Sequence, residues 1–314
     1  MTQHKQHNQA NPFRLPAGMH VFERGWLSSN NILLIDHDDT ALVDSGYVAH
    51  APQTLALVQH TLQERPLRRL LNTHLHSDHC GGNAALQAAY GCHTSIPLPE
   101  TERVRSWDEG ALSFAATGQQ CPRFTVDGAL QAGATVQLGG LDWLLLGSPG
   151  HDPHSLMFYC EQEAILISAD ALWHNGFGVI FSELEGEPGF DAAHATLELI
   201  AGLNVRLVIP GHGALFEDVD AALERAFSRL TYLAADPLRN AQYAVKVLLK
   251  FLLLERQAIP LATLPAVLGG IRLIGDANRR YLHLSEQELA EWVVAQLLKS
   301  GAASISNGLL CNAG

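Results

Sequence analysis

The run His74-Leu75-His76-Ser77-Asp78-His79 places four potential metal ligands within six residues. Imidazole nitrogens and carboxylate oxygens bind transition metals such as zinc. His74 and His76 alternate, so an extended backbone points both rings to the same side, whereas Asp78 and His79 follow on a turn and can point elsewhere. Four such groups cannot all be buried without partners, which disfavours a loop with unrelated histidines. The arrangement suits two neighbouring cations.

Three further candidate ligands share one context. His151, Asp170 and His212 each follow an apolar run of strand length, and a glycine that lets the backbone approach closely stands beside each of the two histidines. In layered α/β proteins, functional side chains gather at strand ends along one edge of a sheet. We therefore expect these three side chains to join the cluster at residues 74–79.

The elements that must position these residues alternate between strands and helices up to about residue 216. Period-two and period-3.6 apolar patterns separate the two kinds of element. The predicted strands are Asn31–Ile35, Thr40–Val43, Leu67–Thr73, Thr135–Leu138, Leu141–Leu146, Ser155–Tyr159, Ala164–Ile167 and Val205–Ile209, and the predicted helices are Ala51–Gln63, Gly82–Tyr90 and Asp191–Leu203, the last with Asp191 as its N-cap. Residues 97–130 are predicted to form short helices and loops.

The last third of the chain is predicted to be mainly helical. An apolar helix at Asp236–Gln257 begins with an Asp-Pro start signal, and Ser285 and Glu288 form a capping box before another helix. Asn307-Gly308 predicts a type I′ turn in a small hairpin. Helices followed by a hairpin resemble a winged helix. We therefore divide the chain into a disordered segment at 1–17, a strand-rich domain at 18–216 and a helical domain at 217–314.

Composition narrows the function classes. The formal net charge is −12, which argues against a nucleic-acid partner, since nucleic-acid binders usually carry a basic face. Lysine occurs only at Lys5, Lys246, Lys250 and Lys299, so the usual lysine contact to an anionic substrate is not expected. The first dozen residues have no apolar core, no stretch reaches the ~18 residues of a membrane span, and five scattered cysteines form no CxxC pair. These features favour a cytoplasmic protein with a small-molecule substrate.

With these motifs the chain resembles the metallo-β-lactamase superfamily over about residues 18–216. Five motifs occur in the family's order, namely Asp44 in Leu42-Val43-Asp44-Ser45-Gly46, the run at residues 74–79, His151, Asp170 and His212. The resemblance implies an αβ/βα sandwich with metals at one edge, here with a C-terminal mainly helical, winged-helix-like extension. It also implies that His74, His76 and His151 bind one metal, that Asp78, His79 and His212 bind a second, that Asp170 bridges them, and that Asp44 orients a ligand.

The resemblance implies a dinuclear hydrolase that uses a metal-bridging hydroxide, with Asp78 as the residue that orients it. The cofactors expected are two divalent transition metals, zinc first, with iron or manganese as alternatives. Glyoxalase II proteins are similar in having both His79 and Asp170. Their last motif is GHE followed by an aromatic residue, whereas this chain has Gly211-His212-Gly213-Ala214. We therefore expect a glyoxalase II-like branch, not a true glyoxalase II, that cleaves a small ester or thioester.

Several alternatives remain open at this stage. The chain could be a lactonase, a ribonuclease with a winged-helix tail, or a degenerate member used for regulation or ligand binding. Substrate contacts are expected at Trp173, His174, Phe177 and Phe181, with weaker candidates at Trp107, Phe114, Arg103, Arg105 and Arg123. His154 departs from the family pattern and is interpreted as a surface or core residue before a substrate contact. The apolar helix at 236–257 could cover the pocket, pack in a core or pair with a second copy in a homodimer, and a core or dimer role is the default.

Overall fold

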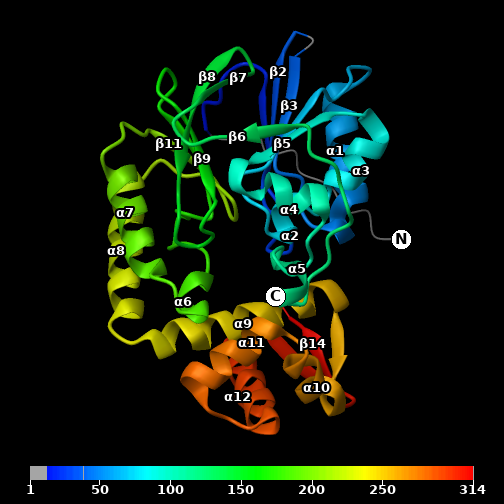
Figure 1. The fold of residues 1–314 in the computed structure, drawn as a ribbon, viewed down its shortest axis with the longest axis vertical. Helices are drawn as coiled ribbons and strands as arrows, with labels where there is room; N and C mark the ends of the chain where they lie inside the picture. Colours follow the sequence, from blue (N-terminus) through cyan, green and yellow to red (C-terminus); the bar gives the residue numbers. More distant parts are fainter. Residues whose placement is uncertain (1–12, 38, 314) are drawn as a thin grey trace.

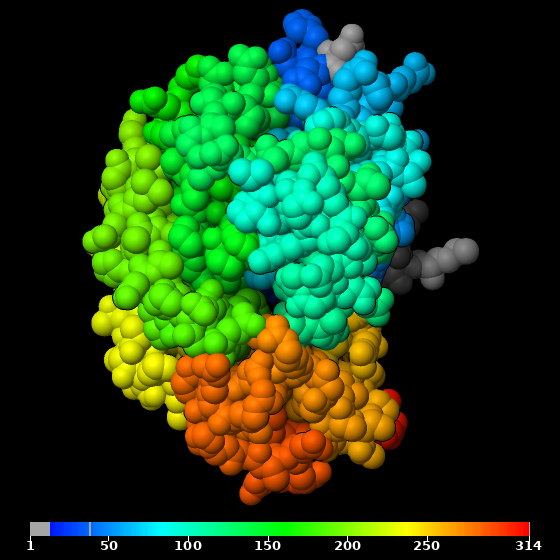
Figure 2. All heavy atoms as spheres, viewed as in Figure 1, coloured from blue at the N-terminus to red at the C-terminus, as the bar shows by residue number. Residues whose placement is uncertain are grey.

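Two β-sheets face each other, helices cover their outer surfaces, and a helical unit lies across one end of them (Figure 1). The structure is a computed structural model and describes residues 13–37 and 39–313. The sandwich confirms the layered α/β architecture expected from the sequence. In the space-filling view, the N-terminal part of the chain and the part that follows it lie side by side, and C-terminal residues lie below the line where they meet (Figure 2).

The first sheet has six strands in the order β1-β2-β3-β4-β5-β6. The strands are β1 Met19–Phe22, β2 Asn31–Asp36, β3 Asp39–Val43, β4 Arg69–Leu71, β5 His93–Pro97 and β6 Gly128–Leu130. Neighbouring strands are antiparallel from β1 to β3 and parallel from β3 to β6. The parallel strands are connected through α1 Ala51–Leu62, α2 Ser77–Cys80, α3 Asn83–Tyr90, α4 Thr101–Ser106 and α5 Ser113–Thr117, with short 3₁₀ turns at Val48–His50 and Leu98–Glu100.

The second sheet has five strands in the order β11-β10-β9-β8-β7. The strands are β7 Thr135–Leu138, β8 Leu141–Gly147, β9 Leu156–Cys160, β10 Ile165–Ala169 and β11 Leu207–Pro210. Only β10 and β11 are parallel neighbours, and the chain between them forms α6 Phe181–Glu185 and α7 Gly189–Ala201. Helix α8 Val219–Ala234 then packs beside α7 on the outer face of this sheet (Figure 1).

The core between the sheets follows from the alternation of side chains along each strand. Ile32 and Leu34 of β2 point into the cluster between the sheets, whereas Leu33 points outward to the layer under α1. From the second sheet, Trp143 is fully buried in the inner cluster, and its Nε1 donates a hydrogen bond to the carbonyl of Leu138 at 3.1 Å. The indole is therefore buried without an unpaired donor.

The C-terminal unit confirms several sequence predictions. It comprises α9 Pro237–Arg256, β12 Ala258–Pro260, a 3₁₀ turn Leu261–Thr263, α10 Leu264–Gly269, α11 Arg272–Ala277, a π-helical turn Asn278–Leu282, α12 Glu286–Lys299, β13 Ala303–Ser306 and β14 Leu309–Asn312. Asp236 caps α9, Ser285 and Glu288 form the capping box of α12, and Asn307 and Gly308 both have positive φ in the hairpin turn. The small sheet has the order β12-β14-β13, so helix, strand, helices and hairpin follow one another as in a winged helix.

Two predictions need correction. Residues 13–17 of the segment predicted to be disordered are ordered, because Phe13 and Leu15 pack against the core between the sheets; residues 1–12 lie outside the described part. The domain boundary predicted after residue 216 stays a prediction; α8, which follows it, packs in the cluster of the second sheet. Asp191 lies inside the first turn of α7, whose Phe190 N–H is bonded instead by Glu183 Oε1 of α6 at 2.8 Å.

Strand β6 also lies within the segment 97–130 that was predicted as short helices and loops, and it pairs with β5.

None of the described helices combines the length and apolarity that a membrane-spanning segment requires.

Candidate metal centre

The candidate ligands lie on four segments that follow strands, at one edge of the sandwich. After β4, the loop carries His74 and His76 and the short helix α2 that follows it carries Asp78 and His79. The loops after β8, β10 and β11 carry His151, Asp170 and His212. Backbone hydrogen bonds tie these segments together, since Gly211 N donates to the carbonyl of Ala169 and Leu156 N to that of Thr73. The two sheets thus bring residues far apart in the sequence to one place.

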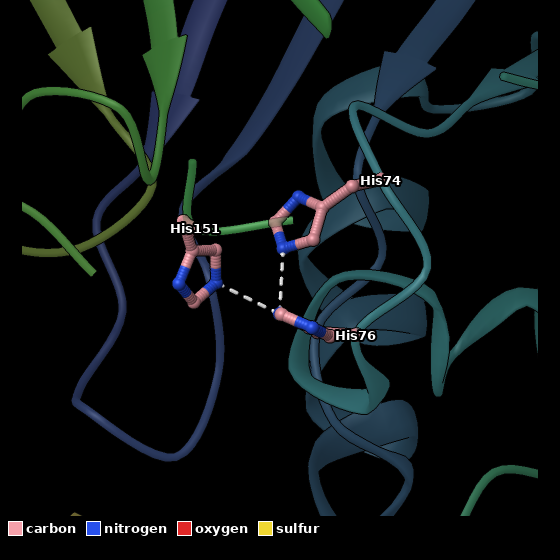
Figure 3. A group of neighbouring side chains, drawn as sticks. All are labelled: His74, His76 and His151. Carbon is pink, nitrogen blue, oxygen red and sulfur yellow. Dashed lines mark hydrogen bonds between the residues drawn. The ribbon is translucent and has the colours of Figure 1, made fainter. Parts of the chain in front are cut away.

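The first cluster consists of three histidines. His74 Nε2 lies 3.1 Å from His76 Nδ1, which lies 2.8 Å from His151 Nε2. Figure 3 shows the three rings turned toward one another, two from one side of the cleft and His151 from the other. Three imidazole nitrogens that converge at this separation are suited to holding one metal ion.

The second cluster consists of Asp78, His79 and His212. His212 Nε2 lies 3.1 Å from Asp78 Oδ2, and His79 is fully buried beside them. His79 Nε2 has no hydrogen-bond partner despite its burial. An unpaired polar nitrogen in a buried site is costly, so the orphaned His79 Nε2 is an independent sign that a cation belongs there.

Asp170 lies between the clusters and offers one oxygen to each. Its Oδ2 lies 3.2 Å from His151 Nε2, whereas its Oδ1 lies 3.4 Å from His79 Nε2 and 3.9 Å from His212 Nε2. A carboxylate in this position can bind two metals at once, one through each oxygen. The structure therefore brings together all seven residues that the sequence suggested as ligands.

Groups behind the histidines fix the direction of their lone pairs. His79 Nδ1 donates to Asp44 Oδ2 at 2.8 Å, and His151 Nδ1 donates to the carbonyl of Val179 at 2.5 Å. A proton on Nδ1 leaves Nε2 free as a ligand atom. Asp44 also accepts from Thr73 N at 2.9 Å and from Thr73 Oγ1 at 2.8 Å. These contacts give Asp44 the orienting position that the family resemblance implied.

Burial sets the protonation states of the first cluster. Burial, with the charges of His79 and His76 added, holds the pKa of His74 well below its usual value. Burial likewise lowers the pKa of His76, and burial together with His76 lowers the pKa of His151 to about 4. These imidazoles are therefore neutral near pH 7, which is the form that binds a metal.

The second cluster is governed by charge. Burial alone would lower the pKa of His79, but the carboxylates of Asp170 and Asp44 raise it well above its usual value. Burial alone would raise the pKa of Asp170, but the charges of His79 and His212 hold it well below its usual range. The buried carboxylates thus attract positive charge to this place, and a divalent cation would supply it.

The donor set fits two divalent transition metals. Five imidazoles and two carboxylates, with no thiolate among them, are ligands that zinc, iron and manganese accept.

A cavity of about 620 Å³ opens above the two clusters. Its floor carries His76, Asp78, His151, Asp170 and His212, and its walls carry Trp26, Trp173 and Phe181. Helix α9 covers it with one face, and it crosses beneath the strand ends between α5 and α6 in Figure 1. The apolar helix predicted to have a core or dimer role thus covers the pocket with one face while its other face packs in the C-terminal core.

The structure separates the predicted substrate contacts. Trp173 and Phe181 line the cavity. Phe177 is buried behind it in the core, under the guanidinium of Arg229. His174 lies outside the cavity, where its Nε2 is 3.1 Å from Asp218 Oδ2. Neither His174 nor Phe177 therefore lines this cavity, and the backbone turns between Trp173 and Gly176, which pair as a bridge.

The weaker candidates do not reach the cavity. Trp107 and Phe114 pack with Phe124 in a small core beside α4 and α5. The three arginines are engaged elsewhere: Arg103 pairs with Glu100, Arg105 with Glu102, and Arg123 donates to the carbonyl of Arg105.

Two functional neighbours were missed from the sequence. Trp26 stacks on His212 at 5.6 Å between ring centroids and stays 58% exposed, and no motif marks it. Asp152, next to His151, lies with its Oδ2 3.7 Å from His76 Nε2 and so stands behind that ligand. His154 bonds Glu100 and does not line this cavity, but it lines a neighbouring one together with His76 and His151.

Comparisons with known proteins agree with this geometry. Residues 24–212 match the sequence profile of the metallo-beta-lactamase superfamily. A hydroxyacylglutathione hydrolase of Methylococcus capsulatus is 31% identical over 37% of this chain and 38% of its own length, and one of Hyphomonas neptunium is 25% identical over 48% and 57%. The lactamase-like protein nscB of Neosartorya fischeri is 26% identical over 62% of this chain and 47% of its own. The chain thus spans about two fifths to three fifths of these relatives.

Solved structures extend the likeness in fold to the C-terminal unit. A metallo-beta-lactamase family protein of Thermus thermophilus has a TM-score of 0.56 at 18% identity, over 95% of this chain and 99% of the other. The BLEG-1 B3 metallo-beta-lactamase has a TM-score of 0.53 at 21% identity, over 66% of this chain and 96% of the other. At these identities the likeness concerns the fold alone.

Proposed function

Because the chain belongs to the metallo-β-lactamase superfamily, we propose that it is a hydrolase that holds two divalent metals and cleaves a small ester or thioester. The observation that carries the proposal is the position of Asp170, whose two oxygens face two separate clusters of ligands. A site that only bound one structural ion would not need a carboxylate between two ligand sets. Zinc is the first candidate for both positions.

Each protein group has a defined part in this proposal. His74, His76 and His151 hold one metal, Asp78, His79 and His212 hold the other, and Asp170 keeps the two positions together. The chemistry that such metals supply when bound is activation of water near neutral pH and polarisation of a carbonyl oxygen. Asp78 lines the cavity and orients the attacking water, while Trp26, Trp173 and Phe181 exclude bulk water and position the acyl group.

Relatives support thioester chemistry. The first two relatives reported above carry the name hydroxyacylglutathione hydrolase, which denotes cleavage of an acyl group from glutathione. The departure at Gly213 from the family's usual acidic residue keeps our proposal at a thioester or ester in general, without glutathione as its carrier. A lactone remains the neighbouring alternative, since it presents the same carbonyl.

Elemental analysis and a substrate panel test the proposal. Protein purified without added metal should contain about two transition-metal ions per chain and should hydrolyse at least one member of a panel of thioesters, esters and lactones. Asp170→Asn should lower kcat/KM by about a hundredfold or more, because both clusters lose the charged ligand that they share, and His76→Ala should abolish turnover. Asp142→Asn, an exposed aspartate on the second sheet, is the matched control. Metal-loaded protein that hydrolyses nothing in the panel would favour a ligand-binding role instead.

One observation favours a second candidate, a ribonuclease. The C-terminal unit follows the strand and helix order of a winged helix, a module that often binds nucleic acid. Helix α12 of that unit, however, begins with Glu286, Glu288 and Glu291, so its exposed face repels phosphate. Cleavage of single-stranded RNA at moderate salt is the deciding assay. A small-molecule substrate, the lack of membrane and nucleic-acid partners, and a homodimer stay predictions.

A further inference from the structure

Three of the four lysines of the chain line the cavity above the metal clusters. They are Lys246 and Lys250 on α9 and Lys299 at the end of α12, and the fourth, Lys5, lies outside the described residues. The chain as a whole carries a formal net charge of −12. Apart from Asp78 and Asp170 on the floor, the lining residues include no acidic side chain. The lining of this cavity therefore carries three ammonium groups against two carboxylates.

Lys250 has a structural role that accounts for it. Its Nζ donates three hydrogen bonds, to the carbonyl of Ala302 at 2.8 Å, to Asn312 Oδ1 at 2.7 Å and to the carbonyl of Ala313 at 2.8 Å. All three donors of the ammonium group are used. Lys250 ties the end of the chain to α9 and is not available to a ligand.

Lys246 and Lys299 have no such partners. Over residues 13–37 and 39–313, no carboxylate lies within 4.0 Å of either ammonium group, and neither donates a hydrogen bond to another residue. Lys246 is half-buried, and burial together with the charge of Arg229 lowers its pKa. The guanidinium of Arg229 itself lies over the ring of Tyr243 at 4.4 Å. A half-buried ammonium next to a second cation is stabilised by a bound anion.

The helix geometry fixes where these charges lie. Tyr243, Lys246, Val247, Lys250, Phe251 and Leu254 of α9 line the cavity, and their spacing of three and four residues places them on one face of the helix. At 1.5 Å per residue this face extends about 16 Å along the cavity. The opposite face is packed in the C-terminal core, so the lysine side chains project from a rigid support.

We propose that Lys246 and Lys299 bind an anionic group on the substrate, a phosphate or a carboxylate carried by the part that leaves with the thiol or alcohol. This inference rests on the proposed function, because it assumes that the acyl carbonyl lies over the metal clusters. The substrate is then an acyl thioester or ester with three parts. The carbonyl meets the metal centre, an apolar or neutral middle crosses Phe251 and Leu254, and the anion reaches the two lysines.

Paired substrates test this proposal. Acyl-phosphopantetheine and acyl-pantetheine share their acyl group and thiol and differ by one phosphate, and S-acyl-N-acetylcysteine and S-acyl-N-acetylcysteamine differ by one carboxylate. Wild-type protein should have the lower KM for the anionic member of at least one pair, and added salt should raise that KM. The pair that shows the preference identifies the anion as phosphate or carboxylate.

The variants Lys246→Gln and Lys299→Gln, alone and together, should raise the KM for that anionic substrate by about tenfold each, as for the loss of a charge-assisted hydrogen bond. The kcat, and both constants for the neutral partner, should stay within twofold. Arg65→Gln is the control, because Arg65 is exposed on the loop after α1, away from the cavity, and its loss changes the net charge equally. Equal effects on the charged and neutral substrates, or no effect of the double variant, would overturn the proposal.

A binding measurement separates this inference from the proposed function. If wild-type protein hydrolyses none of the four thioesters, the hydrolase proposal fails for this class. Calorimetry with phosphopantetheine and with N-acetylcysteine then still measures anion binding by the wild type and the double variant. Binding that the double variant loses supports the lysine site on its own. If the double variant still binds these ligands, the lysine site is overturned. It is also overturned if single-stranded RNA displaces these ligands from the wild type.

Discussion

The substitution Asp44→Asn should release the metal of the second cluster and leave that of the first. Asp44 is 2% exposed and accepts three hydrogen bonds, from Thr73 N and Thr73 Oγ1 and from His79 Nδ1. Both of its oxygens face an N–H donor. Whichever way the asparagine amide turns, its NH₂ group therefore faces another N–H donor. Where that donor is His79 Nδ1, the ring can accept a hydrogen bond only by moving its proton to Nε2, the atom that faces the metal.

Asparagine is the suitable replacement because Asp44 has φ of 60°. Asparagine adopts this left-handed region more readily than other residues with a side chain. Backbone strain is thus kept out of the comparison, and the side chain's size is unchanged.

The expected loss of metal affinity is about 10- to 100-fold at the second cluster, the usual effect of removing a carboxylate behind a histidine ligand. This corresponds to about 1.4–2.8 kcal/mol, at about 1.4 kcal/mol per factor of ten. The loss of one hydrogen bond to a charged group, about 1.5–3 kcal/mol, gives the same range. The first cluster keeps His74, His76 and His151, so its affinity should change less than twofold.

A competitive titration against a chromophoric chelator measures both affinities, and elemental analysis after desalting should give about one metal per chain in place of two. Asp191→Asn is the control, since Asp191 is exposed on α7 and belongs neither to the candidate ligands nor to the lining of the cavity. A variant that retains both metals with wild-type affinity would refute the assignment of Asp44 as the group that fixes the His79 tautomer.

Three further predictions concern stability. Lys250→Met should lower the free energy of unfolding by about 2 kcal/mol through the loss of a charged hydrogen-bond network, with the KM for anionic thioesters unchanged; a raised KM would contradict its structural role. Trp143→Phe should cost about 2 kcal/mol in denaturant unfolding, from the lost volume and hydrogen bond, and an unchanged midpoint would show that the indole is not packed as described. The hydrogen bond to Glu100 is the main cause that raises the pKa of His154. A histidine whose pKa is higher in the folded state than in the unfolded state stabilises the fold fully below the unfolded value of about 6.5. This stabilisation is lost as the pH rises through the folded-state pKa. The stability difference between wild type and His154→Gln should thus be largest near pH 5 and should fall as the pH rises above about 6.5, and a difference that grows with pH would refute the pairing.

The sequence predicted that the candidate ligands meet, because local pattern and topology point to the same place. His151, Asp170 and His212 each follow an apolar run, and strand ends of a layered fold meet at an edge. Spacing alone therefore indicated which residues meet. Asp44 directly follows β3, but its role was implied only by the family resemblance.

The cavity walls could not be predicted in this way. Helix α9 is apolar on more than one face, so its sequence does not indicate that the face with Lys246 turns toward the metal centre. The scarcity of lysine was interpreted as the absence of a lysine contact, yet Lys246 and Lys299 both reach the cavity from the C-terminal unit. Phe114 shows the opposite error, because an aromatic residue in an irregular segment fits a small core as well as a pocket wall.

The origin of the ligands on both sheets has a consequence for folding. No single sheet contains a complete ligand set for the first cluster, since His74 and His76 follow β4 and His151 follows β8. Metal can therefore bind with full affinity only after the two sheets have docked, and it stabilises the docked state by mass action. At a free metal concentration of 100 times Kd, each site adds about 2.7 kcal/mol. A cell starved of metal would hold the same chain in a less stable form, and the abundance of the protein would follow its metal supply.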